Sequence, residues 1–144
     1  MCGVRNLDAC TRRLDAARRD GDALDYQLVG FAEHIETLYA TATLFVCRAG
    51  ALTVAELAAT GTPAVLVPLP GAPGDHQTRN AMTVADAGAA VVVTDSELDD
   101  DRLAQEVDRL LGDPARLAAM GVAAHGLARP DAAARLVDLM EAAI

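Results

Sequence analysis

One stretch constrains the fold more than any other: an apolar run that leads through a small-residue turn into a helical pattern. Residues 44–46 are Leu-Phe-Val, residues 49–51 are all small, and residues 52–60 carry the apolar spacing of a helix. Gly61 and Pro63 end this helix, because glycine adopts the left-handed conformation that closes a helix and proline cannot continue one. The apolar run at 64–67 shows little alternation, which is typical of a strand buried on both faces.

The rest of the chain continues this alternation of strands and helices. The patterns predict a first helix at 6–19 and strands at 26–29, 43–47, 64–67 and 90–93. Helices at 35–42, 52–60 and 75–87 separate the strands, and further helices begin near 96, 113 and 130. Such alternation indicates an α/β fold, a Rossmann-like parallel sheet with helices on both faces. No internal repeat interrupts the chain, so we expect a single domain over 1–144 with a helical tail from about 99.

Composition excludes several classes of protein. The formal net charge is −9 and all 12 basic residues are arginine, so a nucleic-acid partner is not expected. The three cysteines lack any C-x-x-C spacing, which argues against a disulfide scaffold or a zinc site. No apolar run approaches the roughly 18 residues that a membrane span needs, and no signal-peptide pattern is present. These features predict a soluble, cytosolic protein.

The turn after residue 47 has the layout of an anion-binding site. The first turn of a helix has unpaired backbone N–H groups and a partial positive charge, so it holds phosphate without lysine or a metal. Gly50 and the alanines beside it would let a ligand approach the main chain closely. The alternative is an ordinary structural turn. Ligands of parallel sheets bind beyond the carboxyl ends of strands, and the loops 30–32, 48–53 and 69–80 all follow predicted strands.

Two residues of this turn each allow two interpretations. Thr53 and Glu56 have the S/T-x-x-E spacing of a capping box, in which the glutamate only stabilises the helix start. Alternatively, Glu56 accepts hydrogen bonds from the hydroxyl groups of a ribose. Arg48 could reach a phosphate, but its place at a strand end favours an internal ion pair.

Two further clusters carry polar side chains. Gln77 and Asn80 lie three residues apart at the start of a predicted helix, a spacing that suits the recognition of sugar hydroxyls. The alternative is a solvated helix start capped by Asp75, and His76 has no visible partner that would make it a general base. The acidic run 99–101 could hold a metal–diphosphate, but acids also favour the start of a helix.

With these residues in hand, the chain resembles the C-terminal, donor-binding half of the MurG family of UDP-N-acetylglucosamine transferases, which have the GT-B fold and complete lipid II in peptidoglycan synthesis. The resemblance rests on an ordered set of motifs: Tyr26-Gln27-x-x-x-Phe31, Cys47-Arg48-Ala49-Gly50-Ala51-Leu52-Thr53-x-x-Glu56, Gly61-x-Pro63, Val67-Pro68-Leu69-Pro70, Asp75-His76-Gln77-x-x-Asn80-Ala81 and Gly88-Ala89-Ala90.

The resemblance implies a role for each matching residue. Phe31 and Ala32 would border the uracil, although Phe31 alone could equally be a core aromatic. The turn at Gly50 and the amides of 51–53 (Ala51, Leu52 and Thr53) would hold the diphosphate, and Glu56 the ribose. The N-acetylglucosamine would contact His76, Gln77 and Asn80. The family inverts the anomeric centre without a metal or another cofactor, and its catalytic base lies outside the part that this chain matches.

The sequence departs from the family pattern in one respect. The acceptor domain and the first strands of the donor domain are missing, so we expect the sheet to have an unpaired edge and the chain to fold poorly alone or to associate through that gap.

The expected function is transfer of N-acetylglucosamine from UDP-GlcNAc to undecaprenyl-diphosphate-muramoyl-pentapeptide. This would take place at the inner face of the plasma membrane, with the acceptor domain supplied by missing sequence or by another chain. The alternatives are a non-catalytic UDP-sugar-binding module or remnant, and a related GT-B transferase with another acceptor.

Overall fold

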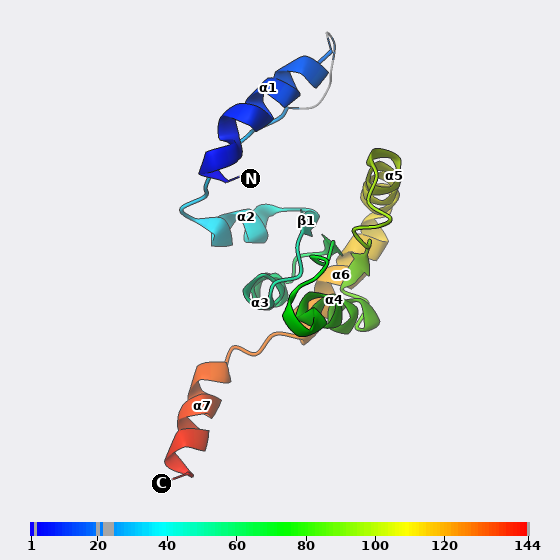
Figure 1. Ribbon diagram of the computed structural model, residues 1–144. Coiled ribbons are helices and arrows are strands. Elements are labelled where there is room, and N and C mark those ends of the chain that lie inside the picture. The colour runs from blue at the N-terminus through cyan, green and yellow to red at the C-terminus, as the bar shows by residue number, and fades with distance from the viewer. Residues whose placement is uncertain (2, 20, 22–24, 144) are drawn as a thin grey trace. The chain divides into compact units, whose positions relative to one another are not determined.

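The computed structural model describes residues 1, 3–19, 21 and 25–143 (Figure 1). The chain divides into two compact units, Met1–Ile35 and Glu36–Ile144, and each is described by itself.

The first unit contains a short helical turn and one helix. The 3-10 turn η1 (Val4–Asn6) leads into α1 (Leu7–Ala17), which lies within the predicted helix at 6–19, and Asn6 takes the N-cap position. The predicted strand at 26–29 is wrong, because these residues have no regular secondary structure. A strand exists only through hydrogen bonds to a neighbouring strand, and no described segment forms a ladder with 26–29.

The second unit is built on a parallel sheet of three strands. The strands are β1 (Phe45–Cys47), β2 (Ala64–Leu66) and β3 (Ala90–Val92), in the order β1-β2-β3. All three residues of the central strand β2 are buried, as the non-alternating pattern predicted. The helices of the unit are α2 (Ile35–Thr41, which begins at the boundary between the units), α3 (Ala51–Thr60), α4 (His76–Asp86, preceded by the turn η2, Pro73–Asp75), α5 (Asp100–Leu111), α6 (Pro114–Gly126) and α7 (Ala132–Glu141). The predicted α/β class with a Rossmann-like parallel sheet is confirmed.

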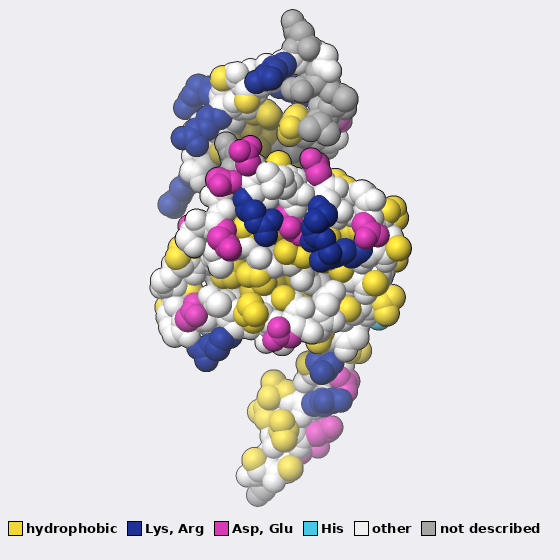
Figure 2. Space-filling view, turned by 90° about the vertical axis from the view of Figure 1, so that its right-hand side faces the viewer, with side chains coloured by type: hydrophobic (Ala, Val, Ile, Leu, Met, Phe, Trp, Pro, Cys, Tyr) yellow, Lys and Arg dark blue, Asp and Glu magenta, His cyan; other side chains and the backbone are white. Residues whose placement is uncertain are grey.

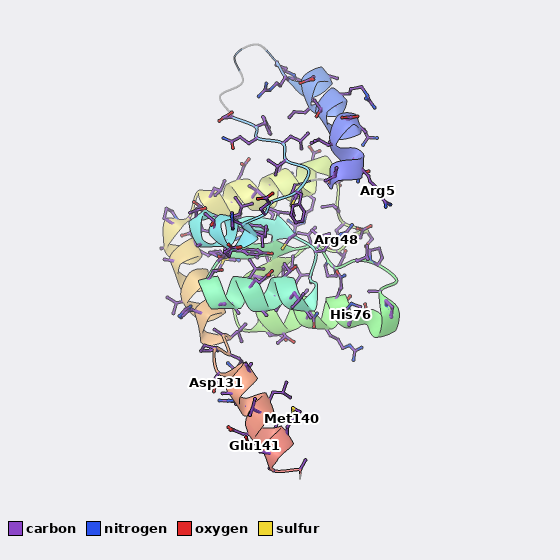
Figure 3. All side chains as sticks on the ribbon, turned by 90° about the vertical axis from the view of Figure 1, so that its left-hand side faces the viewer. Arg5, Arg48, His76, Asp131, Met140 and Glu141 are labelled. Carbon is purple, nitrogen blue, oxygen red and sulfur yellow. The ribbon has the colours of Figure 1, made fainter. Side chains whose placement is uncertain are left out.

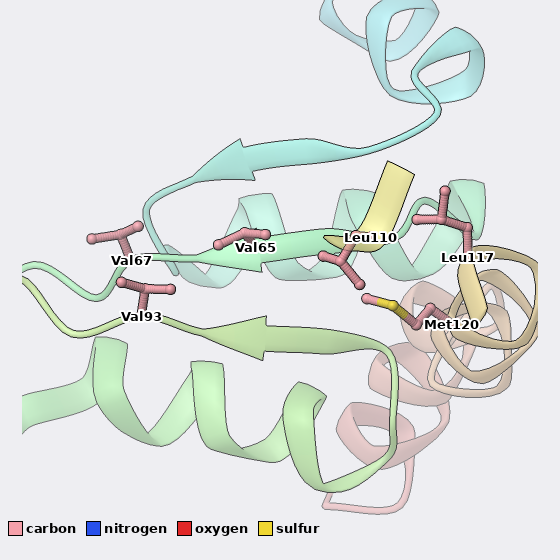
Figure 4. Packing of buried hydrophobic residues seen from close by; sticks show 6 residues of the cluster. All are labelled: Val65, Val67, Val93, Leu110, Leu117 and Met120. Carbon is pink, nitrogen blue, oxygen red and sulfur yellow. The ribbon is translucent and has the colours of Figure 1, made fainter. Parts of the chain in front are cut away.

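The core joins the sheet to the helices of the tail. It consists of buried side chains from the sheet region and from α5 and α6, which Figure 4 shows facing one another: Val65, Val67, Val93, Leu110, Leu117 and Met120. The helices α5 and α6 therefore belong to the same hydrophobic core as the strands, and they stabilise the sheet from which the loops of the carboxyl edge extend.

A close contact between two glycines brings α6 to the end of α3. Gly61 closes α3 in the left-handed conformation, with φ of 67°, as the sequence predicted. A Cβ placed on Gly121 would lie only 2.9 Å from the carbonyl oxygen of Gly61, so a larger residue does not fit there. The absence of side chains at both positions lets the two segments approach at backbone distance.

The last helix, α7, differs from α5 and α6 because none of its residues is buried. Hydrophobic side chains gather on it in the lower part of Figure 2, and Leu136, Leu139 and Met140 are 59%, 69% and 62% exposed. Among the described residues, no helix combines the length and the apolar character that crossing a bilayer requires.

Candidate functional site

The carboxyl edge of the sheet brings two of the predicted ligand-binding loops together. The loop 48–53 follows β1 and the loop 69–80 follows β2, and the strands are parallel, so both loops leave the sheet at the same edge. Figure 3 shows the labelled side chains of Arg48 and His76 on the same side of the sheet. A hydrogen bond of 3.0 Å from Asn80 Nδ2 to the carbonyl oxygen of Ala49 links the two loops directly.

The third predicted loop, Gly30-Phe31-Ala32, does not follow a strand. It belongs to the first unit, where a Cβ on Gly30 would lie 3.2 Å from the Cα of Val4. The loop was assigned to the edge of the sheet because 26–29 was read as a strand, and that reading is wrong. Phe31 is 70% exposed, so it is not a core aromatic in the structure, and its contact with a uracil stays a prediction.

The start of α3 has open backbone donors. Gly50 is the N-cap residue and makes no side-chain cap, and the first helical hydrogen bond runs from the Val54 N–H to the Gly50 carbonyl (3.0 Å). No described residue accepts a hydrogen bond from the amides of 51–53. Leu52 is 79% exposed, and a Cβ on Gly50 would meet only the hydroxyl of Thr53, at 3.7 Å. This geometry can hold an anion, because donors and the positive end of the helix dipole both face solvent.

The capping-box interpretation of Thr53 and Glu56 is wrong. The helix begins at Ala51, so Thr53 lies inside its first turn and Gly50 takes the N-cap position. A capping box requires the Ser or Thr at the N-cap itself, where its side chain can reach the free amides. The glutamate therefore has no role in capping α3.

The side chain of Glu56 instead contacts the hydroxyl group of Tyr39. Burial raises the pKa of Tyr39, and the hydrogen bond with the Glu56 carboxylate raises it further, whereas a hydrogen bond with Thr53 lowers it. The tyrosine ring is 5% exposed and packs against Phe45 with 4.5 Å between ring centroids. Tyr39, on α2, therefore lies beside Glu56. The sequence predicted the helix that carries Tyr39 but not this contact.

Gln77 and Asn80 bond to the backbone through opposite atoms of their amide groups, Gln77 through its oxygen and Asn80 through its nitrogen. The Oε1 of Gln77 accepts a hydrogen bond from the Leu69 N–H (3.0 Å), which leaves its NH₂ group to donate elsewhere. Asn80 donates through Nδ2 to Ala49, so its carbonyl oxygen remains an acceptor. One side chain therefore offers donors and the other an acceptor, which suits hydroxyl groups that both accept and donate.

The helix α4 begins where it was predicted, after Asp75, but the Asp75 side chain does not cap it. Asp75 takes the N-cap position in the left-handed conformation (φ 53°), but its carboxylate accepts from the Thr78 hydroxyl (2.7 Å) and makes no cap to a backbone amide. The Nδ1 of His76 lies 2.8 Å from the Pro73 carbonyl oxygen. A carbonyl can only accept, so Nδ1 donates in this contact, and Nε2 is the ring nitrogen left for a ligand.

Arg48 forms the internal ion pair that the sequence favoured. Its Nη1 lies 2.6 Å from Oδ1 of Asp95, which follows β3. The same nitrogen also donates to the carbonyl oxygens of Val67 (3.3 Å) and Pro68 (3.1 Å), which follow β2. Sequence analysis did not identify Asp95, because it lies 47 residues from its partner.

The acidic run at 99–101 has the helix-start role that the sequence favoured. The Oδ1 of Asp99 accepts from the Arg102 N–H at 2.6 Å and caps α5. Among the described residues, no three His, Cys, Asp or Glu side chains lie together as metal ligands.

Comparison with known proteins assigns the chain to a family. The glycosyltransferase family 28 C-terminal domain matches residues 2–136. The chain belongs to this family. Two curated relatives, both named UDP-N-acetylglucosamine–N-acetylmuramyl-(pentapeptide) pyrophosphoryl-undecaprenol N-acetylglucosamine transferase, come from Alkalilimnicola ehrlichii (52% identical) and Geobacter metallireducens (45% identical). Each alignment covers 96% of this chain, and 38% and 36% of the respective relative.

Solved structures agree with this assignment. A crystal structure of MurG from Acinetobacter baumannii is similar with a TM-score of 0.87 and 40% identity, over 98% of this chain and 40% of that one. The glycotransferase of kitacinnamycin shares the fold, with a TM-score of 0.59 and 21% identity over 96% of this chain and 40% of that one. The predicted resemblance to the C-terminal part of MurG is therefore confirmed. The chain spans a little over a third of the length of the curated relatives it matches.

Proposed function

We propose that this chain is the donor-binding part of a transferase that moves N-acetylglucosamine from UDP-GlcNAc to undecaprenyl-diphosphate-muramoyl-pentapeptide, which converts lipid I to lipid II. The family and the names of the curated relatives support the reaction. The observation that carries the donor site is the open start of α3, where three consecutive amides have no partner among the described residues.

The diphosphate of the donor binds at the amides of 51–53. In the reaction the acceptor hydroxyl attacks the anomeric carbon, the bond from that carbon to the β-phosphate oxygen breaks, and UDP leaves with the negative charge. Amides and a helix dipole that already point at this charge stabilise it without reorganisation. No metal or other cofactor takes part in the proposed mechanism, and the base that accepts the proton of the hydroxyl lies outside this chain.

The remaining donor contacts are proposed from the resemblance to the family, and the bonds of Glu56, Gln77, Asn80 and His76 support their part in it. Glu56, which lies beside the hydroxyl group of Tyr39, accepts from the ribose hydroxyls. The NH₂ group of Gln77, the carbonyl oxygen of Asn80 and Nε2 of His76 contact the N-acetylglucosamine. Phe31 and Ala32 border the uracil.

The acceptor requires a second domain. The curated relatives are longer than the alignment, so the lipid-linked acceptor binds in a further part of the protein or on a chain that associates with this one. The reaction takes place at the inner face of the plasma membrane, where the complete enzyme is a peripheral protein.

Calorimetric titration of the chain with UDP, UDP-GlcNAc and UMP tests the donor site. We expect UDP and UDP-GlcNAc to bind, and UMP to bind about tenfold or more weakly, because it lacks the β-phosphate that the α3 amides hold. Circular dichroism establishes that the sample is folded. A folded chain that binds none of the three, or that binds UMP as tightly as UDP, would overturn the proposal.

A further inference from the structure

One guanidinium connects the ends of all three strands. Arg48 follows β1 directly, the carbonyls of Val67 and Pro68 follow β2, and Asp95 lies three residues beyond β3. A single nitrogen, Nη1, lies within 3.3 Å of all three acceptors. The side chains of Arg48 and Asp95 are 46% and 38% exposed, so this pair lies at the surface of the carboxyl edge.

Arg48 and one of its partners are next in sequence to the residues that bond to Gln77 and Asn80, the two side chains proposed to bind the sugar. Pro68, whose carbonyl accepts from Arg48, is followed by Leu69, whose N–H donates to Oε1 of Gln77. On the other side, the residue next to Arg48 is Ala49, which is fully buried and accepts from Asn80. The backbone anchor of Gln77 is thus next in sequence to a carbonyl that Arg48 holds, and the anchor of Asn80 is next in sequence to Arg48 itself.

We propose that Arg48, oriented by Asp95, is a positioning residue that fixes the orientation of the Gln77 and Asn80 amides and thereby sets the selectivity for the sugar of the donor. This inference rests on the proposed function. Without Arg48, the peptide between Pro68 and Leu69 loses the bond that holds it against the end of β1. Gln77 then has no fixed anchor, and its amide group rotates freely.

The diphosphate site depends on different contacts. The amides of 51–53 are oriented by α3 itself, through the bond from Val54 to Gly50 and the helical bonds that follow it. The partners of Arg48 are Val67, Pro68 and Asp95, and all three lie outside α3. Loss of Arg48 therefore affects binding of the sugar more than binding of UDP. A residue that only stabilised the fold, or one that bound phosphate, would affect both ligands equally.

Two substitutions and one control test the inference. Arg48→Met keeps the length of the side chain and removes its charge and donors, and Asp95→Asn keeps the shape of the acceptor and removes its charge. Arg102→Met removes a guanidinium that donates to Glu106 on α5 (2.9 Å), so it breaks an ion pair elsewhere in the same unit. Each protein is titrated with UDP and with UDP-GlcNAc, and the readout is the ratio of the two affinities.

We expect Arg48→Met to lower the affinity for UDP-GlcNAc relative to UDP about fivefold, as the loss of one well-oriented hydrogen bond predicts. Asp95→Asn should lower the ratio less, and Arg102→Met should leave it unchanged. An unchanged ratio in Arg48→Met would overturn the inference. An equal fall for both ligands would also overturn it, and would make Arg48 a phosphate ligand or a general support of the fold.

A second measurement needs no ligand. Hydrogen exchange at the Leu69 amide reports its bond to Gln77. We expect this amide to exchange faster in Arg48→Met, whereas the Val93 amide, bonded to Leu66 within the sheet at 3.0 Å, keeps its protection. If wild type binds no UDP, the proposed function fails, and this exchange still decides whether Arg48 positions Gln77. If Arg48→Met does not fold, Arg48→Gln replaces it, because the shorter, uncharged side chain cannot donate to all three acceptors.

Discussion

The helices α3 and α5 begin at comparable places in the fold, but only α5 has a side chain that caps its first turn. Each follows a strand of the parallel sheet, α3 after β1 and α5 after β3. The start of α5 is closed by Asp99, whose carboxylate accepts from the Arg102 amide at 2.6 Å. The start of α3 has Gly50 in the same position, which has no side chain to offer, and its first amides point to solvent.

The comparison indicates that α3 gives up some helix stability and keeps its first amides available for a ligand. A glycine at the N-cap stabilises a helix less than an aspartate does, by about a few tenths of a kcal/mol, and α3 forgoes that much. An uncapped start is not in itself a site, since Asp131 at the start of α7 makes no cap either. What distinguishes α3 is that Glu56, Gln77 and Asn80 lie on the segments that meet at its first turn.

The largest expected effect comes from giving α3 the kind of start that α5 has. The backbone of Gly50 (φ −64°, ψ 149°) is extended, which is the conformation of an N-cap aspartate. In Gly50→Asp the new carboxylate should bond to the free amides and repel the diphosphate. We expect the affinity for UDP to fall about a hundredfold or more, while the free energy of unfolding rises by about 0.5–1 kcal/mol. Calorimetry and urea denaturation measure the two changes.

Gly50→Ala is the matched control, because it adds one methyl group without charge or cap. Its Cβ meets only the Thr53 hydroxyl at 3.7 Å, so the fold should tolerate it. The loss of affinity should be much smaller than with aspartate. If Gly50→Asp stabilises the chain and still binds UDP as wild type does, the ligand does not use these amides, and the contrast between the two helix starts has no functional meaning.

The next effect concerns Glu56, which the structure removes from any role in the cap. Glu56→Gln should lower the affinity for UDP about tenfold, because an amide replaces a charged acceptor of ribose hydroxyls. The free energy of unfolding should change by less than about 1 kcal/mol, since the bond to Tyr39 can persist with the amide oxygen. A loss of stability without a change in affinity would show that the glutamate supports only the packing of α2 on α3.

Local patterns predicted most of the fold. The buried strand β2, the closing Gly61 and the helix start near 113, where Asp113 caps α6 and Pro114 opens it, were all predicted from the sequence. Each depends on residues within a few positions of one another, where backbone conformation and capping decide the outcome. The strand at 26–29 was wrong because a strand also needs a neighbour that its own sequence does not specify.

The site could be predicted only in part, for a related reason. The motifs put Gly50 at the start of one helix and Gln77 and Asn80 at the start of the next, as the structure has them, but the S/T-x-x-E spacing of Thr53 was misleading. The pattern is compatible with two helix starts three residues apart, and the structure begins the helix at the earlier one. The bonds that orient the site join distant residues, such as Arg48 to Asp95, and a sequence pattern does not contain such distances.

A smaller effect is expected at the capped helix. Asp99→Ala should lower the free energy of unfolding by about 1 kcal/mol, because the Arg102 amide loses its acceptor. The affinity for UDP should stay within a factor of about two, since no ligand is proposed to bind at this helix start. Urea denaturation and calorimetry on the same sample check both values. A fall in affinity as large as that of Glu56→Gln would mean that α5 also belongs to the donor site.

The smallest effect depends on pH and lies within α5. Glu106 is 5% exposed, and its hydrogen bonds with Arg109 and Arg102 hold its pKa below the usual value of 4.5 despite the opposing effect of burial. A carboxyl whose folded pKa is lowered stabilises the fold above its unfolded pKa, and this contribution is lost as the pH falls through the lowered folded value. Because both arginines are partly exposed, solvent weakens the pairs, and Glu106→Gln should cost about 1 kcal/mol or less near neutral pH.

The same substitution tests whether the charges of α5 serve only stability. As the pH is lowered from 6 to about 3, the unfolding free energies of wild type and Glu106→Gln should converge, because wild type loses its charged pairs and the variant has none to lose. Urea denaturation at each pH measures the difference. A gap that stays constant over this range would assign the cost to packing. At neutral pH the UDP affinity of the variant should match that of wild type, whereas substitutions at the start of α3 change UDP affinity at any pH where the chain is folded.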